Sequence, residues 1–280
     1  MFTSGLPAGQ DARWPGFEAN ASFERWPARA NIDPVNTHIT PKAAAAATRH
    51  LPLPPGDDER VLGFGVMGLP FVSGHYLAFR DFPASSFSPA YLSVWHRDPA
   101  GEWTFYATTP GPQSCSRYFS SATPVDPAVC DIDMSWPTPW SLSISIDGLL
   151  DWHLDIEATP ATRLMTAIGT RLPVAAWNSR PVLAVMSRVV GPILGLGTIR
   201  LTGTAPNGQG FRIAPKRVWS VASSTAVVRG EDLGPIGPLP EQARLGDFRL
   251  PQRGICVVGH GRFDPFDPIR HRNDRLELSS

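Results

Sequence analysis

Four ionisable side chains fall on one face of two or three predicted neighbouring strands: Asp131, Asp133, His153 and Asp155. Because successive side chains of a strand point to opposite sides, these four are expected to share a face. Close carboxylates raise one another's pKa, and a carboxylic acid kept protonated in an apolar barrel could donate a proton to an alkene, epoxide or carbonyl. His153 could return that proton. The simpler alternative is a solvated outer face, because barrel interiors usually take the apolar side.

A second group of candidate residues lies in the earlier strands. His75 has the same parity as Leu77, and His96 the same parity as Val94, so both imidazoles are expected to point inward. A histidine among apolar neighbours is either a catalyst or a core residue whose hydrogen bonds are satisfied, and both alternatives stay open. Ligand contacts are expected from aromatic, methionine and arginine side chains, namely Tyr76, Trp95, Arg117, Trp152, Met165 and Met186.

The sequence 63–68 matches the Gly-x-Gly-x-x-Gly pattern of dinucleotide-binding proteins, but its context does not fit. That fingerprint needs a strand that turns into a helix, whereas Leu69-Pro70-Phe71 follows here without a helical period. Glycines at a bend of a barrel strand explain it better. No Gly-x-Ser-x-Gly elbow, phosphate-binding loop or His-Glu-x-x-His helix is present, and His153 with Asp155 would supply only two metal ligands. We therefore expect neither a metal nor a cofactor.

The composition indicates many strands and turns. Proline and glycine account for 30 and 25 of the 280 residues, and both fit turns better than long helices. The balance of 25 basic and 25 acidic residues, with only 18% charged in total, excludes a basic nucleic-acid domain, a disordered chain and a coiled coil. Period-2 alternation predicts strands at 61–67, 72–82, 91–97, 103–108, 114–121, 129–136, 141–147 and 151–157.

The last three of these strands have a well-specified register. Pairing Met134 with Leu142 and Ile146 with Trp152 keeps all of their apolar side chains on one face, and a one-residue slip would mix the two faces. Turns such as Asp98-Pro99-Ala100-Gly101 separate the strands. We expect a mostly β protein in which an antiparallel meander closes into a barrel, either single or split into two parts.

A helical hairpin at 160–194 is predicted to interrupt this barrel. Thr159-Pro160 supplies a hydroxyl cap and a proline at the first helical position, and Leu172-Pro173 ends the first helix. The second helix begins near 179–181 and stops at Gly191-Pro192. Strands resume at 198–203, 211–221, 226–229 and 255–259, with a hairpin turn at Asn207-Gly208. The expected organisation is an irregular wrap at 1–58, in which 43–47 could form one or two helical turns, a barrel at 59–260 and a tail at 261–280.

Charge is distributed unevenly along the chain. Residues 158–230 contain nine basic and no acidic side chains, whereas residues 1–157 contain 17 acidic and 9 basic ones. The basic segment either pairs with the acidic first part or lies on an anionic membrane surface, with Trp177 at the interface. No secretory leader or run of about 18 apolar residues is seen, so a cytoplasmic protein without nucleic-acid partners is expected. Its cysteines are expected to be buried and inert, and its oligomeric state stays open.

Three features together resemble the lipocalin-like proteins that include carotenoid hydratase (hydroxyneurosporene synthase) and tocopherol cyclase. They are the tryptophan-rich meander, the helical interruption, and strand ends such as Leu150-Asp151-Trp152-His153. The resemblance covers about residues 60–260 and implies a barrel that binds long apolar molecules, some of which such proteins hydrate or cyclise by protonating an alkene. It carries over no catalytic residue.

The leading hypothesis is that a barrel cavity binds an isoprenoid, polyketide or acyl-type molecule. The protein would either run a cofactor-free cyclisation, hydration or isomerisation, as a lyase or isomerase, or act as a non-catalytic carrier. A third hypothesis is a peripheral membrane protein whose basic hairpin sits on lipid.

Overall fold

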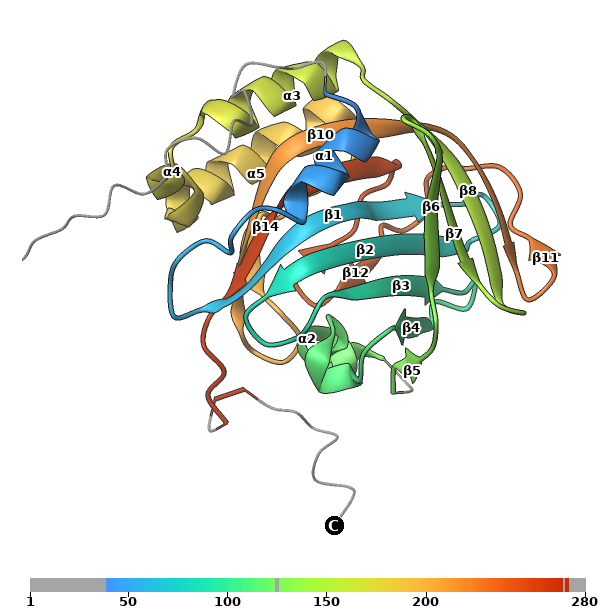
Figure 1. Ribbon diagram of the computed structural model, residues 1–280, viewed down its shortest axis with the longest axis horizontal. Helices are drawn as coiled ribbons and strands as arrows, with labels where there is room; N and C mark the ends of the chain where they lie inside the picture. The colour runs from blue at the N-terminus through green and yellow to red at the C-terminus, as the bar shows by residue number, and fades with distance from the viewer. Residues whose placement is uncertain (1–38, 124–125, 269, 272–280) are drawn as a thin grey trace, which may run out of the picture. The chain divides into compact units, whose positions relative to one another are not determined.

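The computed structural model describes residues 39–123, 126–268 and 270–271, all of which belong to one compact unit (Figure 1). Most of the predicted wrap and tail lies outside these ranges. The strands are β1 (Glu59–Pro70), β2 (Tyr76–Ser85), β3 (Tyr91–Arg97), β4 (Trp103–Ala107), β5 (Ala128–Val129), β6 (Asp133–Thr138), β7 (Ser141–Ile146), β8 (Leu150–Glu157), β9 (Thr202–Thr204), β10 (Gly210–Val228), β11 (Glu231–Asp232), β12 (Arg244–Leu245), β13 (Phe248–Arg249) and β14 (Ile255–Phe263). The helices are α1 (Pro41–Thr48), α2 (Ser116–Phe119), α3 (Pro160–Arg171), α4 (Val174–Asn178) and α5 (Arg180–Leu194), with 3₁₀ turns η1 (Gly111–Gln113) and η2 (Ser120–Ala122).

The main sheet runs in the order β5-β4-β3-β2-β1-β14-β10-β8-β7-β6, and β9 and β11 also pair with β10. Its neighbours are antiparallel except for the parallel pair β4–β5. The two edge strands, β5 and β6, are consecutive in sequence and joined by residues 130–132 alone. Four residue steps span at most about 14 Å, so the sheet must curl until its edges approach each other. The mostly β, barrel-like architecture expected from the sequence is therefore confirmed (Figure 1).

The predicted faces of β6–β8 are confirmed, but their pairing is two residues out of register. Met134 pairs with Ile144, and Ile144 with Trp152, instead of the predicted partners. The β7–β8 connection is only three residues long, with Gly148 at φ +63°, so Ile146 pairs with Leu150. A two-residue shift leaves every side chain on its own face, so apolar patterning cannot distinguish the two registers.

Three other strand predictions were wrong. The strand predicted at 129–136 is interrupted at 130–132, which connect β5 to β6 at the opposite edge of the sheet. The segment predicted as a strand at 114–121 forms α2 and part of η2, because Ser114 and Ser116 both donate to the carbonyl of Gly111 and close local turns. The strands predicted at 211–221 and 226–229 are one continuous strand, β10, in which a register shift between Val221 and Ser223 absorbs the polar interruption.

The helical hairpin begins as predicted, since the Thr159 hydroxyl accepts a hydrogen bond from the backbone of Thr162. A short additional helix, α4, follows α3. The second long helix, α5, continues past the predicted stop because Pro192 lies in its last turn, and it ends at Gly195, which adopts φ +65°. In the N-terminal segment, residues 43–47 lie within α1, which Thr40 caps.

The sheet is buried on both faces along part of its length. One face forms the barrel core, where Phe64 of β1 meets Trp136 of β6 at 5.3 Å between ring centroids and α1 also packs. The opposite face of β2–β4 carries a second core, covered by α2 and β13. Helix α3 approaches β10 so closely that a Cβ on Gly169 would lie 2.7 Å from the carbonyl oxygen of Lys216. Strands covered on both sides do not show a simple alternation of polar and apolar residues.

Candidate functional site

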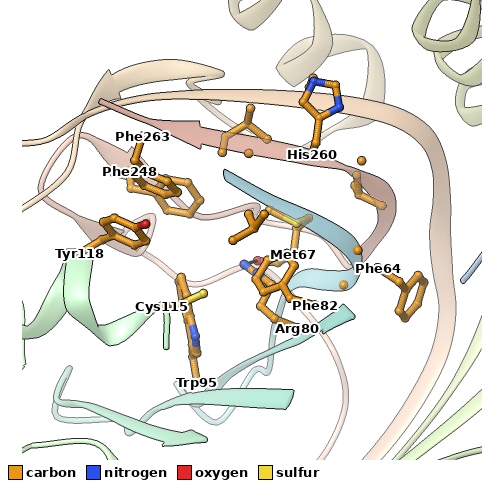
Figure 2. A pocket seen from close by; sticks show the side chains of 18 of the residues that line it. Phe64, Met67, Arg80, Phe82, Trp95, Cys115, Tyr118, Phe248, His260 and Phe263 are labelled. Atoms are coloured by element: carbon orange, nitrogen blue, oxygen red, sulfur yellow. Dashed lines mark hydrogen bonds between the residues drawn. The ribbon is translucent and has the colours of Figure 1, made fainter. Parts of the chain in front are cut away.

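An apolar cavity of about 70 Å³ opens on the sheet face opposite the barrel core, and we call it the Arg80 cavity (Figure 2). Strands β1, β2 and β14 supply its floor, where Met67 and Arg80 lie. Its walls come from Trp95 of β3, Phe119 of α2 and Phe248 of β13. Segments separated by more than 150 residues therefore meet around one space.

Glycines in β1 and β14 make room on this face. A Cβ at Gly63 would lie 2.0 Å from the carbonyl oxygen of Asp81, so the close approach of β1 and β2 requires glycine there. At Gly261 a Cβ would instead point toward the side chains of Val61 and Ile213, at 3.1 and 3.3 Å. The Gly-x-Gly-x-x-Gly segment lies wholly inside β1. It is therefore part of a barrel strand, as predicted, and does not form a strand-to-helix nucleotide loop.

Arg80 is a buried cation, only 3% exposed, and it lines this cavity. Its Nη1 donates to the carbonyl oxygens of Val66 (2.5 Å) and Phe79 (2.8 Å), and its Nη2 donates to that of Met67 (3.2 Å). None of the ion pairs in the described ranges includes Arg80. Burial lowers the pKa of the guanidinium. Buried charges are normally paired, so a cation held only by carbonyls is unusual.

Trp95 adds a hydrogen-bond donor that lacks an acceptor. Its side chain is 1% exposed, and its Nε1 has no hydrogen-bond partner among the residues that the structure describes. Arg80 Cζ stands 4.6 Å from the centroid of the same indole. Figure 2 shows Arg80, Trp95 and Cys115 together on one side of the cavity. The site therefore combines a cation and a free N–H, both of which are suited to an anionic oxygen.

The other polar groups near the cavity are neutral at ordinary pH or already paired. Burial raises the pKa of the Cys115 thiol, and burial also raises the pKa of Tyr91, whose hydroxyl lies 3.3 Å from the Cys115 sulfur. The Tyr118 hydroxyl donates to Glu59 at 2.7 Å, and Glu59 is also paired with Arg117 at 2.7 Å. These groups leave Arg80 as the charged group directed at the space.

His260 and Phe64 also border the cavity, but their rings point away from Arg80 and Trp95 in Figure 2. This agrees with their parity, because both alternate with the cavity-facing residues of their strands. Burial, with smaller contributions from Lys216 and Arg262, lowers the pKa of His260 to about 4. Its imidazole is neutral and belongs to the other face of the sheet.

A second cavity of about 70 Å³ adjoins the first beneath α5. Four residues line both spaces and so form a common wall: Met67, Ile213, Phe248 and Val257. The remaining lining is largely aliphatic and includes Val190 and Leu194 of α5. The two apolar spaces are therefore neighbours, with these four side chains between them.

Of the six predicted ligand-binding residues, the structure places Trp95 in the Arg80 cavity. Tyr76 packs in the same core, but its hydroxyl donates to the Pro251 carbonyl at 2.7 Å, and it does not line the space. Arg117 lies nearby and is held by Glu59. The other three pack elsewhere: Trp152 in the barrel core, Met165 on the buried side of α3 and Met186 against the core around Trp177.

The predicted acid–base cluster lies on the solvent side of the sheet. Asp131 and Asp133 are exposed, and His153 and Asp155 are partly exposed. His153 contacts Ser143 at 3.0 Å and Asp155 at 3.5 Å, and hydrogen bonds from Ser141 and Ser223 lower the pKa of Asp155. A proton donor at this place would need an apolar environment that raises its pKa, and the surroundings here are polar and open. The outer-face alternative describes these residues correctly.

His75 and His96 are buried, on the face predicted for them, and lie in contact with each other. His75 Nδ1 is 3.0 Å from His96 Nε2, and the two rings stack with centroids 5.2 Å apart. Burial, followed by the charge of His75, lowers the pKa of His96 to about 4. His75 Nε2 lies 3.7 Å from the carboxylate of Glu231. In the part of the chain that the structure describes, no three His, Cys, Asp or Glu side chains could together hold a metal ion.

Sequence reasoning missed Arg80, although a signal for it was available. Arg80 is a cation inside the apolar run 76–82, with the same parity as Tyr76 and Ala78. Phe248 and Val257 carried no comparable signal, because their place in the site depends on tertiary packing.

No protein-family model matches the chain, and no curated protein matches it. Two solved structures of acetoacetate decarboxylase are similar to it. One, from Legionella pneumophila, is 10% identical with a TM-score of 0.35 and covers 76% of this chain and 87% of that chain. The other is 8% identical with a TM-score of 0.36 and covers 76% of this chain and 88% of that chain. The resemblance to carotenoid hydratases and tocopherol cyclases stays a prediction.

Proposed function

We propose that this protein binds a hydrophobic molecule with a carboxylate head, of isoprenoid, polyketide or acyl type. The carboxylate would accept hydrogen bonds from Arg80 and from Trp95 Nε1, and the apolar part would occupy the two adjoining cavities. The observation that carries the proposal is the buried, carboxylate-free Arg80 in an apolar cavity.

The energetics favour an anionic head over a neutral one. Leaving a buried cation without a counter-charge costs several kcal/mol, whereas each hydrogen bond to a charged group contributes roughly 1.5–3 kcal/mol. A carboxylate in the cavity offsets part of the cost of the unpaired cation and also forms such hydrogen bonds. An alcohol of equal length offsets little of that cost. A preference for the acid of about tenfold to a hundredfold is therefore expected, since about 1.4 kcal/mol corresponds to a factor of ten.

A carrier role fits the cavity better than catalysis does. General acid–base chemistry needs a group whose pKa lies near the working pH. Burial holds the thiol of Cys115 and the phenol of Tyr91 in their protonated forms, and the imidazole of His260 faces away. The described lining residues therefore bind and orient a head group rather than transfer its protons.

The buried histidine pair favours a second candidate, acid–base chemistry on the barrel side of the sheet. Glu231 favours a proton on His75 Nε2, so His75 Nδ1 would accept from His96 Nε2. Nδ1 of His96 would then be the nitrogen left to accept a proton, as a weak base whose pKa burial lowers to about 4. Incubating the protein with an unsaturated acid in heavy water tests this reaction. Deuterium in the recovered acid that disappears with His96→Gln supports it, and no incorporation by the unmodified protein refutes it.

Calorimetric titration with octanoic acid and with 1-octanol tests the carrier function. The unmodified protein should bind the acid at least tenfold more tightly, and Arg80→Met should remove most of that preference. Arg244→Met, which changes an exposed arginine outside the cavity, is the matched control and should behave like the unmodified protein. Equal affinity of the unmodified protein for both ligands would refute an anion-binding site. If Arg80→Met does not fold, Trp95→Phe tests the same head-group site.

A further inference from the structure

The outer surface of α3, α4 and α5 exposes a stripe of aliphatic side chains, and we call it the hairpin face. Seven large residues on it are between 36% and 63% exposed: Leu164, Ile168, Val174, Val182, Val185, Val189 and Ile193. Folded proteins rarely leave so many aliphatic side chains in water on one contiguous set of helices.

Helix α5 is apolar on two opposite sides. Its buried side, which includes Leu183 and Leu194, packs onto the fold, while Val185 and Val189 lie on the exposed side. A surface helix normally has one apolar stripe, and packing within the domain accounts for the first of these two stripes only. The exposed stripe therefore lacks a partner in the described part of the chain.

The charge around this stripe has one sign. Arg163, Arg171 and Arg188 are exposed on the same helices, and no ion pair within the described ranges includes them. Arg180 differs, because it pairs with Asp264 at 2.7 Å. No acidic residue occurs anywhere in 158–230. The hairpin face is thus aliphatic and cationic together.

We propose that the hairpin face docks on the surface of an anionic phospholipid bilayer. Its aliphatic side chains would enter the boundary between head groups and acyl chains, and the arginines would contact lipid phosphates and carboxylates. None of the helices in the described ranges is long and apolar enough to cross a membrane, so docking is confined to the surface.

A bilayer fits this face better than a second copy of the chain or another protein does. In a symmetric dimer the face would meet itself, which would bring unpaired arginines of both copies together in an apolar interface. Protein interfaces are enriched in aromatic residues, whereas the exposed stripe is aliphatic. The expectation that Trp177 lies at the membrane interface was wrong, because its side chain is buried. Anionic lipid offers both the apolar layer and the opposite charge.

The location of the face also relates to the proposed cargo. Val190 and Leu194 of α5 line the second cavity, so the helix that would rest on lipid covers the space next to the Arg80 cavity. This connection rests on the proposed function, whereas docking itself does not require a cargo.

Sedimentation of the full chain with vesicles tests the docking. The unmodified protein should sediment with equimolar phosphatidylcholine and phosphatidylserine and remain in solution with phosphatidylcholine alone. Removing three arginines in Arg163→Gln/Arg171→Gln/Arg188→Gln should weaken partitioning roughly a hundredfold, at about fivefold per arginine near the surface. The charge control Arg244→Gln/Arg253→Gln changes two exposed arginines that do not belong to these helices and should bind like the unmodified protein.

Replacing exposed valines of α5 with serine tests the contribution of apolar side chains to vesicle binding. Val185→Ser/Val189→Ser should weaken vesicle binding while leaving circular dichroism unchanged, since both side chains are exposed. No sedimentation of the unmodified protein with anionic vesicles overturns the proposal, as does sedimentation that survives the triple arginine change. A dimer in size-exclusion chromatography that Val185→Ser/Val189→Ser dissociates would also overturn it, by assigning the face to a second copy. Because the assay contains no cargo, its result is independent of whether Arg80 binds an acid.

Discussion

The wall shared by the two cavities gives the sharpest test of how a ligand would lie. Val257 of β14 contributes to both spaces and is partly exposed toward them. Replacing it with phenylalanine adds a ring where one apolar chain would pass from the Arg80 cavity to the space beneath α5. Val257 pairs with Gly65, which pairs in turn with Arg80, so the affinity for short acids is the control that the carboxylate contacts at Arg80 and Trp95 remain.

The magnitude follows from the burial of methylene groups. Each buried methylene contributes about 0.8 kcal/mol, which is close to a fourfold change in Kd. The unmodified protein should therefore bind straight-chain acids about fourfold more tightly for each added methylene until both spaces are filled. In Val257→Phe this gain should stop once the first space, of about 70 Å³, is full. Short acids should bind both proteins equally.

Calorimetric titration with straight-chain acids from butanoic to decanoic acid measures this dependence. Val72→Phe adds the same ring at a position 66% exposed and should reproduce the unmodified profile. The reasoning is refuted if Val257→Phe shows the same gain per methylene as the unmodified protein over the whole series, because one chain then does not pass through both spaces.

Three further predictions concern the site and its supporting strands. Trp95→Phe removes an unpartnered N–H, so the free energy of unfolding should stay within about 1 kcal/mol in urea titrations while octanoic acid binds roughly tenfold more weakly. The pKa values of His96 and His260 are lowered to about 4, so the unfolded chain takes up protons first as pH falls, and stability should decrease between pH 6.5 and pH 4 by about 3 kcal/mol per ring. His96→Phe should roughly halve that dependence, because His260 still contributes, and an unchanged slope would contradict the assignment. Gly63→Ala places a Cβ 2.0 Å from the Asp81 carbonyl and should cost about 2 kcal/mol or more in thermal unfolding, whereas an unaltered Tm would show that β1 and β2 can separate there.

Local patterns in the sequence predicted the elements that depend on local chemistry. Alternation from 132 to 156 assigned the two faces of β6–β8, because pleating alone sends successive side chains to opposite sides. Thr159-Pro160 located the start of α3, because a hydroxyl cap and a proline satisfy a helix N-terminus without help from distant residues. The same local reasoning failed at 114–121, where serine hydroxyls closed turns that a strand pattern does not reveal.

The inward placement of His75 and His96 was also predictable from parity, but their contact with each other was not. It depends on the register of β2 with β3, which pairs Leu77 with His96 and so brings His75 Nδ1 to 3.0 Å from His96 Nε2. Parity likewise separated the acidic outer face from the apolar one, and burial then showed that Asp131 and Asp133 lie in solvent.

The sequence by itself therefore determined a mostly β chain, a capped helical hairpin and the segregation of side chains to opposite faces, since these depend on near neighbours along the chain. Only the tertiary structure decided where a ligand could lie. The Arg80 cavity exists because β1 and β14 carry glycines side by side, and because Phe119 and Phe248 cover that face from distant parts of the chain. Long-range packing also leaves Arg80 without a carboxylate partner in the described part of the chain. Composition alone cannot show which charges remain unpaired after folding.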